Sequence, residues 1–156
     1  MILGIDPGVN KTGFALVFNG KLFKHKTLSG SEAISYARSL AMAYQFKKCI
    51  VERPRLGVLY SRHMTKNNAL MSESGRIKLA QNIGQNIQLT NDIVSELDRL
   101  GVKTKQVPPA RKATKWPTDY WQRIFNWEGR CPSEHARDAS VIALQWEKWA
   151  GWEFYA

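Results

Sequence analysis

Two carboxylates stand where strand ends would present them to one edge of a sheet. Asp6 ends a short apolar run and is followed at once by Pro7 and Gly8, which turn the chain. Glu52 ends a second apolar run and is again followed closely by a proline. Like charges at close range are costly unless a cation lies between them. The pair therefore indicates a metal site, and the alternative is a turn-forming Asp beside a solvated Glu.

A second group of candidate ligands lies near the C-terminus, where five residues recur at i+3 and i+4 spacing and so share one helix face. They are His135, Asp138, Ala139, Ile142 and Trp146. The apolar members indicate an inward face, on which an unpaired carboxylate at Asp138 is expensive. A metal or a basic partner must compensate it. The alternative is that Asp138 forms a salt bridge with an Arg or Lys and that His135 is a core residue. Glu134 fits the positive end of the helix dipole better than the site.

Basic residues gather directly after Glu52. A basic loop beside a metal site is suited to gripping phosphates, and apolar or aromatic members could wedge into opened base steps. The alternative is an ordinary solvated loop. The candidate DNA contacts are Arg53, Arg55, Tyr60, Arg62, Lys66, Arg76 and Lys78, joined by a second cluster at Arg111, Lys112 and Lys115.

The overall charge agrees with an anionic partner. The 156 residues include 23 Lys and Arg against 13 Asp and Glu, giving a net charge of +10. Such an excess favours nucleic acid, although a basic surface that merely aids solubility is the alternative. No apolar run approaches the roughly 20 residues that cross a bilayer. We therefore expect a cytoplasmic protein without a membrane partner, in which Cys49 and Cys131 are reduced structural thiols.

Five strands are expected to position the site. The apolar runs predict strands over residues 2–6, 13–18, 21–27, 49–51 and 102–107. Asn19-Gly20 is a strong hairpin signal, so the first three strands form an antiparallel meander. The first and fourth strands can then lie side by side, which would bring Asp6 and Glu52 together.

Helices are expected between and after these strands, at residues 31–47, 75–99, 117–127 and from Ser133 to Trp149. Ser31 is a candidate N-cap of the first helix. In the long second helix the inward residues are expected to be Ala80, Ile83, Ile87, Val94 and Leu97, with a close-packing point at Gly84. The element order predicts an α/β fold with a mixed five-stranded sheet (three antiparallel strands, then two parallel) flanked by helices. No linker divides the chain, so one domain spanning 1–156 is expected.

Three segments together resemble a known family. Residues 2–8 (Ile-Leu-Gly-Ile-Asp-Pro-Gly) and 12–15 (Thr-Gly-Phe-Ala), residues 50–52 (Ile-Val-Glu) and residues 135–139 (His-Ala-Arg-Asp-Ala) resemble, in order and spacing, the motifs of the RuvC Holliday-junction resolvases. These enzymes belong to the ribonuclease H-like superfamily. The resemblance spans residues 1–146.

The resemblance implies a ribonuclease H-like fold and a Mg²⁺-dependent endodeoxyribonuclease holding two Mg²⁺ ions, or Mn²⁺ in their place. It implies that Asp6 bridges the ions, that Glu52 and Asp138 each hold one, and that His135 ligates a metal or orients the attacking water. Two cations about 3.5–4 Å apart can generate the nucleophile and stabilise the leaving oxygen. A lysine after the fifth strand, Lys112 or Lys115, would stabilise transition-state charge.

The expected substrate is a four-way DNA junction, cleaved by paired symmetric nicks. A symmetric homodimer would deliver two active sites to such a substrate, and the long helix is a candidate interface. The family's Gln-x-Phe-type stretch after the glutamate is absent here, and Tyr60 is the nearest aromatic. The alternatives are a flap, fork or RNA/DNA-hybrid nuclease, or a noncatalytic nucleic-acid-binding module. The turn after the first strand also resembles the phosphate loop of the actin-like ATPases. These proteins need a second phosphate motif, which this sequence lacks, so a nucleotide cofactor is not expected.

Overall fold

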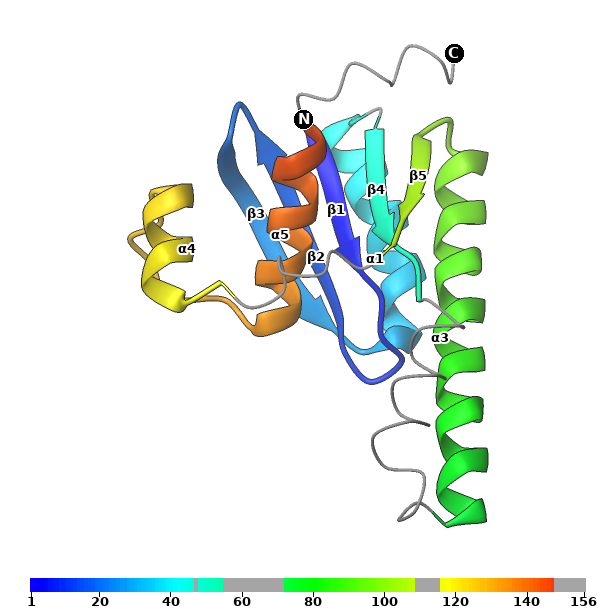
Figure 1. The fold of residues 1–156 in the computed structure, drawn as a ribbon. Coiled ribbons are helices and arrows are strands. Elements are labelled where there is room, and N and C mark those ends of the chain that lie inside the picture. Colours follow the sequence, from blue (N-terminus) through cyan, green and yellow to red (C-terminus); the bar gives the residue numbers. More distant parts are fainter. Residues whose placement is uncertain (47, 55–71, 109–115, 148–156) are drawn as a thin grey trace.

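The structure is a computed structural model, and it describes residues 1–46, 48–54, 72–108 and 116–147. Helices and strands follow one another in the order that the sequence predicts (Figure 1). The strands are β1 (Ile2–Asp6), β2 (Thr12–Phe18), β3 (Lys21–Leu28), β4 (Lys48–Glu52) and β5 (Lys103–Val107). The helices are α1 (Gly30–Tyr44), α3 (Glu73–Arg99), α4 (Thr118–Phe125) and α5 (Glu134–Glu147).

The five strands form one mixed sheet in the order β3-β2-β1-β4-β5. β1 and β3 each pair with β2 antiparallel, which confirms the predicted meander. The predicted tight turn is also present, since Asn19 and Gly20 both have positive φ angles, 50° and 75°. β1 pairs with β4 in parallel, and β4 pairs with β5 in parallel. Strands β1 and β4 therefore end side by side, as expected.

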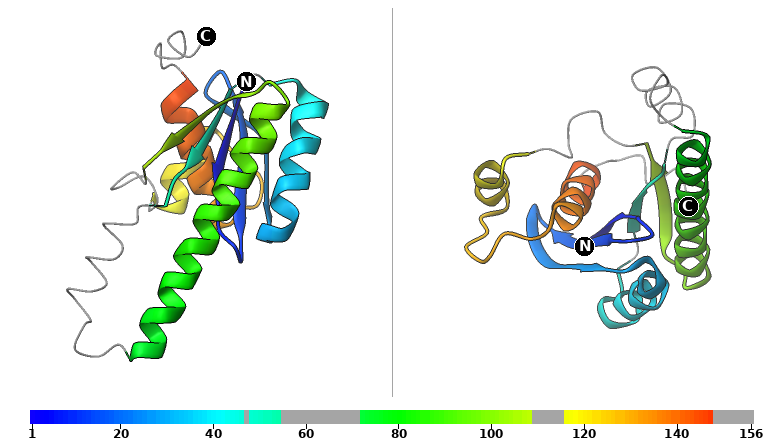
Figure 2. Two further views of the ribbon diagram at one scale, coloured as in Figure 1. Left: turned by 90° about the vertical axis from the view of Figure 1, so that its right-hand side faces the viewer. Right: turned by 90° about the horizontal axis from the view of Figure 1, so that it is seen from below.

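Helices cover both faces of the sheet, as the end-on view in Figure 2 shows. Successive residues of β1 point to opposite faces. Ile2 joins a core with residues of α5 and with Trp121 and Phe125 of α4, whereas Leu3 joins a second core with residues of α1 and α3. The predicted α/β class with a mixed five-stranded sheet is therefore confirmed.

Two glycines let the backbone of α5 lie directly on the sheet. A Cβ atom added at Gly4 in β1 would collide with the carbonyl oxygen of Ala139 and would lie 2.9 Å from the Cβ of Ala143. A Cβ atom added at Gly13 in β2 would collide with the carbonyl of His135. Side chains at these two positions would push α5 away from the strands.

Helix α1 begins one residue before its expected start, and the predicted N-cap at Ser31 is wrong. Ser29 is the N-cap, and the Glu32 carboxylate accepts hydrogen bonds from the Ser29 backbone N–H (3.3 Å) and hydroxyl (2.5 Å). This Ser-x-x-Glu spacing is a capping box. Ser31 lies inside the first turn instead.

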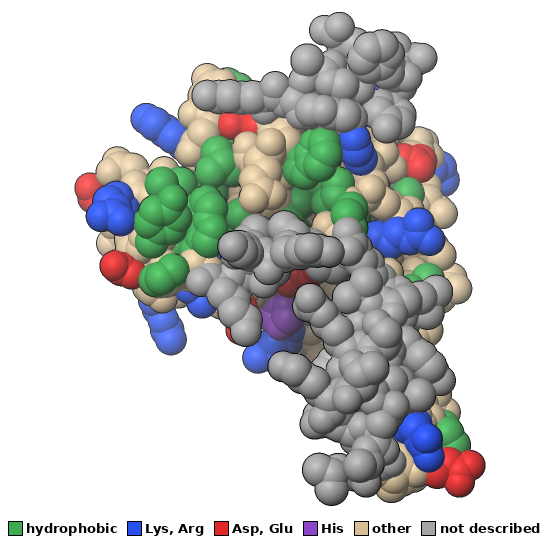
Figure 3. All heavy atoms as spheres, viewed as in Figure 1, with side chains coloured by type: hydrophobic (Ala, Val, Ile, Leu, Met, Phe, Trp, Pro, Cys, Tyr) green, Lys and Arg blue, Asp and Glu red, His purple; other side chains and the backbone are tan. Residues whose placement is uncertain are grey.

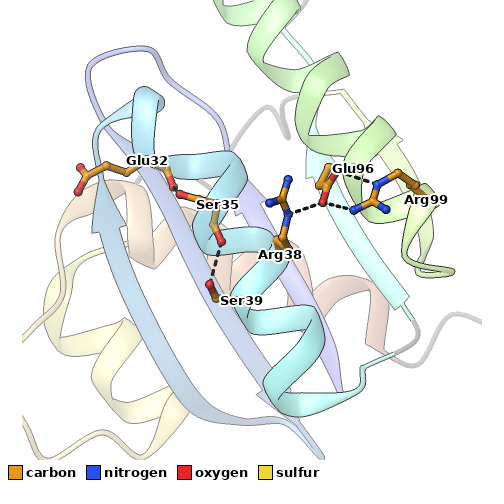
Figure 4. A network of polar contacts seen from close by, with 6 residues as sticks. All are labelled: Glu32, Ser35, Arg38, Ser39, Glu96 and Arg99. Carbon is orange, nitrogen blue, oxygen red and sulfur yellow. Dashed lines mark hydrogen bonds and ion pairs between the residues drawn. The ribbon is translucent and has the colours of Figure 1, made fainter.

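A network of charged side chains links α1 to α3 on the outer side of the layer that these two helices form (Figure 4). Glu96 of α3 accepts hydrogen bonds from Arg99 at 2.9 and 3.1 Å and from Arg38 of α1 at 2.6 Å. These two guanidinium groups lower the pKa of Glu96 to about 2. The Glu96 carboxylate therefore stays ionised at any ordinary pH and links the two helices.

Helix α3 is the longest element, and its first half runs past the end of the sheet where β1 and β4 finish (Figures 1 and 2). It begins at Glu73, two residues earlier than expected, and the Ser72 hydroxyl caps it by accepting a 3.2 Å hydrogen bond from Gly75. Ile83 and Leu97 are buried as predicted, but Ala80 is exposed because the sheet no longer lies beneath it. Gly84 is not a close-packing point, since no described atom lies within 4 Å of a Cβ built there.

The remaining elements agree closely with expectation. α4 occupies the interior of the predicted 117–127 helix, and its Trp121 is fully buried, donating a 2.8 Å hydrogen bond from its indole to Ser140. α5 begins at Glu134 after Ser133, while the predicted end at Trp149 lies outside the described residues. Both cysteines are free thiols. In the described part of the chain, no helix is long and apolar enough to cross a bilayer.

The glycine contacts generate a prediction on stability. Gly4→Ala is expected to lower the free energy of unfolding by about 3 kcal/mol or more, because the new methyl group meets backbone that cannot move aside. Gly84→Ala is the matched control and is expected to raise it by about 0.5–1 kcal/mol, because alanine loses less chain entropy within a helix. Urea denaturation followed by circular dichroism measures both. Equal effects of the two substitutions would contradict the close approach of α5.

Candidate active site

The site lies at one edge of the sheet, where two neighbouring strands end and a helix begins. Asp6 is the last residue of β1, Glu52 is the last residue of β4, and the first turns of α5 carry His135 and Asp138. Parallel pairing of β1 with β4 places the two strand-end carboxylates on the same edge. The structure thus places all four residues that the sequence predicts as metal ligands at the same edge of the sheet.

The one direct contact among the four is between Asp6 and His135. The Nδ1 atom of His135 lies 2.8 Å from Oδ2 of Asp6. This hydrogen bond, opposed by partial burial of the ring, raises the pKa of His135 above its ordinary value of 6.5. The Asp6 side chain is only 15% exposed, whereas the His135 side chain is 41% exposed. The imidazole is therefore both anchored from within and open to solvent.

The other two carboxylates are held in an unfavourable environment for negative charge. Burial, followed by the charge of Asp6, raises the pKa of Glu52 to about 7. Burial, then the charges of Asp6, Glu52 and Glu134, raises the pKa of Asp138 to about 8, and only His135 acts in the other direction. Among the described residues, no lysine or arginine contributes to either pKa shift. Such a concentration of carboxylates is typical of a cation site.

The donor set suits a hard divalent cation. Three carboxylates offer up to six oxygen donors, the ligand type that Mg²⁺ and Mn²⁺ prefer, and the imidazole adds a nitrogen. Among the described residues, no three His, Cys, Asp or Glu side chains are already close enough to share one ion. The elements bring the donors to one edge, and the carboxylates repel one another there. The residues therefore fit a metal site in kind and position, and side-chain movement would complete its coordination shell.

Local contacts hold the loop that follows Asp6. The Thr12 hydroxyl, fully buried, donates to the Gly8 carbonyl (2.9 Å) and accepts from the Gly8 N–H (3.2 Å). A Cβ at Gly8 would lie 2.6 Å from the Lys11 carbonyl, so the turn requires glycine there. On the other side of the site, Ser133 caps the start of α5 by accepting from Ala136 (3.3 Å) and bonding Thr27 of β3 (2.5 Å).

Part of the predicted DNA-binding set surrounds this edge. Arg53 directly follows Glu52 and is exposed, and Arg76 and Lys78 are exposed on the projecting half of α3. Figure 3 shows Lys and Arg side chains around the margin of one face, with hydrophobic side chains gathered over α4 and α5. The remaining predicted residues lie outside the described part of the chain: Arg55, Tyr60, Arg62, Lys66, Arg111, Lys112 and Lys115.

The structure adds residues near the site that the sequence did not single out. A groove of about 320 Å³ beside His135 is bounded by Lys11 of the β1–β2 loop and by Asn82, Gln85 and Asn86 of α3. The polar positions on α3 follow helical spacing, which was a usable signal. The contact between this loop and α3 brings together residues more than seventy positions apart in the sequence, and no local pattern indicates it.

No family model and no curated protein matches the chain by sequence. Solved structures do match. Thermus thermophilus RuvC in complex with a Holliday junction substrate is 16% identical, with a TM-score of 0.63, covering 92% of this chain and 89% of that one. The separate T. thermophilus RuvC structure is 13% identical, with a TM-score of 0.58, covering 92% and 90%.

A viral protein shows the same likeness. The Fowlpox virus resolvase, solved with Holliday junction DNA, is 15% identical, with a TM-score of 0.54, covering 94% of this chain and 97% of that one. The predicted ribonuclease H-like fold is therefore confirmed, and so is the resemblance to RuvC-type resolvases in architecture.

The raised pKa values generate a prediction on stability against pH. Asp138 has an ordinary pKa of 3.8 and a pKa of about 8 in the folded protein, so the folded state binds more protons than the unfolded state between these values. Its contribution to stability therefore falls as pH rises from about 4 to 8. Without metal, Asp138→Asn is expected to be more stable than the wild type at pH 9 by roughly 1–2 kcal/mol, a figure reduced for partial exposure.

Urea denaturation in EDTA at pH 5, 7 and 9 measures this effect. Glu128→Gln is the control, because it removes the same charge from an exposed position. The Asp138→Asn advantage should shrink at pH 5, and Mg²⁺ should stabilise only the wild type appreciably at pH 9. Parallel stability profiles for the wild type and Asp138→Asn would contradict the proposed crowding of carboxylates.

Proposed function

We propose that this protein is a metal-dependent endonuclease that cleaves four-way DNA junctions. The observation that carries the proposal is the convergence of Asp6, Glu52, His135 and Asp138 on one sheet edge, with raised pKa values at Glu52 and Asp138. The fold on which these residues lie is that of two proteins solved with Holliday junction DNA. The net charge of +10 supports a polyanionic substrate.

The carboxylates are the proposed metal ligands. Asp6 would bridge two ions, with Glu52 holding one and Asp138 the other, because its charge acts on both of these carboxylates. Bound Mg²⁺ or Mn²⁺ would activate water and stabilise negative charge on the phosphate oxygens. Neutralisation of the crowded carboxylates by the ions would also remove the repulsion that raises the pKa values of Glu52 and Asp138.

His135 is the proposed proton acceptor. With Nδ1 hydrogen-bonded to Asp6, the neutral ring keeps its lone pair on Nε2. That nitrogen can take a proton from the attacking water, and Asp6 stabilises the imidazolium that results. The half-exposed position of the ring allows this proton to pass on to solvent. Removal of the ring would therefore slow the hydrolytic step without removing the carboxylates.

Substrate binding is proposed to rest on the basic residues around the site. Arg53 is exposed directly after Glu52, and Arg76 and Lys78 are exposed on the projecting half of α3. These three side chains can contact phosphates that flank the scissile bond. The rest of the predicted set (Arg55, Tyr60, Arg62, Lys66 and Arg111) would extend this surface. Lys112 or Lys115 would stabilise the charge of the transition state.

Paired symmetric nicking is proposed to require a homodimer. A four-way junction has near two-fold symmetry, so two sites related by a two-fold axis match it. The long helix α3 is the candidate interface. The alternatives are a nuclease of the same fold acting on flaps, forks or RNA/DNA hybrids, and a noncatalytic binding module. Only the substrate and product distinguish these functions.

Cleavage of labelled synthetic DNA tests the function. With Mg²⁺, the wild type is expected to nick a four-way junction symmetrically and to leave linear duplex, flap and RNA/DNA hybrid largely intact. Asp6→Asn is expected to lose at least about 100-fold in rate while still binding the junction, because a metal ligand is lost and the basic surface is kept. Glu128→Gln is the control and should cleave like the wild type.

Each other outcome favours a different function. Metal-dependent cleavage of flaps or hybrids in preference to junctions would move the protein to another nuclease class. Binding without cleavage in either Mg²⁺ or Mn²⁺ would favour the noncatalytic module. Cleavage that persists in Asp6→Asn would contradict the proposed site.

A further inference from the structure

A cavity lies at the end of the sheet opposite to the candidate active site. Residues at the starts of β1 and β4 line it, whereas Asp6 and Glu52 end these two strands. The N-terminus marks this end of the sheet in Figure 1. At about 3.3 Å per residue, β1 alone separates the cavity from Asp6 by roughly 13 Å. The proposed hydrolytic reaction therefore does not use this cavity.

The lining of the cavity suits a large apolar group. Its volume of about 390 Å³ is within the range of pockets that bind ligands, about 300–1,000 Å³. Ile2 and Phe46 in its lining are buried, and Tyr44, the last residue of α1, is half-buried. An apolar group that enters such a lining is removed from water, which is favourable.

Two exposed phenylalanines stand beside the cavity. Phe18 is 51% exposed and directly precedes Asn19, which lines the cavity. Phe23 is 57% exposed, and its ring meets the ring of Tyr44 edge to face, with 5.6 Å between the centroids. In the described part of the chain, four large hydrophobic side chains are more than half exposed, and these are two of them. Exposed aromatic side chains next to a pocket are typical of a protein-binding surface.

Lysines surround these aromatic side chains. Lys21 is exposed at the start of β3. The ammonium group of Lys24 donates a 3.1 Å hydrogen bond to the Tyr44 hydroxyl, which raises the pKa of Lys24. Lys48 lines the cavity itself. This end of the sheet therefore attracts negative charge.

Charge also distinguishes among the possible occupants. A second copy of this chain carries the same net charge of +10 and is repelled by the lysines, whereas an acidic partner is attracted. A DNA strand laid across the cavity would meet the Glu147 carboxylate in its lining, which accepts a 2.6 Å hydrogen bond from Gly20. A polypeptide avoids this repulsion, because its backbone N–H groups are uncharged and can donate to a carboxylate.

The position of β3 favours a polypeptide for a second reason. β3 is an edge strand of the sheet. The backbone N–H and C=O groups along a sheet edge are suited to pairing with an extended segment. Lysines on an edge strand oppose pairing with another basic strand, and their charge favours an acidic one.

These side chains define a distal surface, which comprises Phe18, Lys21, Phe23, Lys24 and Tyr44 with the cavity beside them. We propose that the distal surface binds an acidic segment of a partner protein, which inserts one large apolar side chain into the cavity. The acidic side chains of the segment contact the lysines, and the two phenylalanines pack against the inserted group. Because the active site is at the other end of the sheet, the partner can stay bound while a substrate occupies that site.

Binding of fluorescein-labelled synthetic peptides, measured by fluorescence anisotropy, tests this inference. The probe is a library of short peptides that combine Asp and Glu with one Phe, Leu or Trp. The controls are peptides without the apolar residue and peptides with Lys in place of Asp and Glu. The wild type is expected to bind members of the library with micromolar dissociation constants and to bind both kinds of control at least about tenfold more weakly.

Exposed phenylalanines allow a variant that keeps the fold and the charge. Phe18→Ser with Phe23→Ser is expected to lower the affinity for the best peptides at least about tenfold, because aromatic contacts of the interface are lost. Ile77→Ser is the matched control, since Ile77 is 53% exposed on the projecting half of α3, and it should bind the peptides like the wild type. Both variants should keep the circular dichroism spectrum and the junction affinity of the wild type.

Competition with an unlabelled four-way junction separates the distal surface from the DNA-binding residues. The junction should leave the peptide bound, because the two surfaces lie at opposite ends of the sheet. Displacement of the peptide by the junction would mean that the peptide occupies the DNA-binding residues, and it would overturn the inference. An equal loss of peptide affinity in Ile77→Ser, or no binding by any peptide of the library, would also overturn it.

Two further outcomes would identify a different occupant. Lower junction affinity in the phenylalanine double variant would make DNA the occupant of the distal surface. A dimer that sediments as a monomer in the same variant would make a second copy of the chain the occupant. Either result would overturn the inference, and the nuclease proposal is tested separately by cleavage.

Discussion

The site depends on the close approach of α5 to β1 and β2. Gly13 pairs with Asp6 in the sheet, and a side chain at Gly13 would collide with the carbonyl of His135, the residue that hydrogen-bonds Asp6. Gly4 provides the same closeness two residues before Asp6, against Ala139. The absence of side chains at Gly4 and Gly13 therefore sets the distance between α5, which carries His135 and Asp138, and β1, which carries Asp6. The three-element site follows from backbone contact rather than from contacts among its own side chains.

The acidic groups themselves oppose folding. Burial and like charge raise the pKa values of Glu52 and Asp138, so part of their ionisation free energy is lost whenever the protein folds without a counter-ion. Packing on both faces of the sheet offsets this loss. One core joins β1 and β2 to α4 and α5, the other joins them to α1 and α3, and Trp121 is buried in the first. A site with unfavourable electrostatics can persist because its positions are determined elsewhere.

The sequence predicts the strand-end part of the site well and its helix-borne surroundings less well. Asp6 and Glu52 end apolar runs, and the Asn19-Gly20 turn leaves β1 free to pair with β4, so local signals are sufficient. His135 and Asp138 follow from helical spacing on an inward face. The capping box from Ser29 to Glu32 was a readable signal that favours Ser29 over Ser31 as the cap.

Other features depend on how far a packing partner extends. The apolar repeat of α3 continues through Ala80, and periodicity indicates the side that faces inward without indicating that the sheet has ended. The groove is likewise not predictable from a local pattern, because Asn82 becomes a groove residue only when the loop after β1 lies against α3. That contact rests on the hydrogen bond from Val9 to Asn86, which spans 77 positions and leaves no pattern in either segment.

The two halves of α3 have different surroundings because the helix is long. Its C-terminal half is fixed by the buried Ile93 and Leu97 and by the ion pairs of Glu96 with Arg38 and Arg99. At about 1.5 Å per residue, the 27-residue helix reaches about 40 Å, far enough to leave its first half beside the site as an exposed wall. Side chains on a rigid helix are positioned more closely than side chains on a loop. Arg76 and Lys78, which are exposed on that half, are therefore held in fixed positions beside the proposed site.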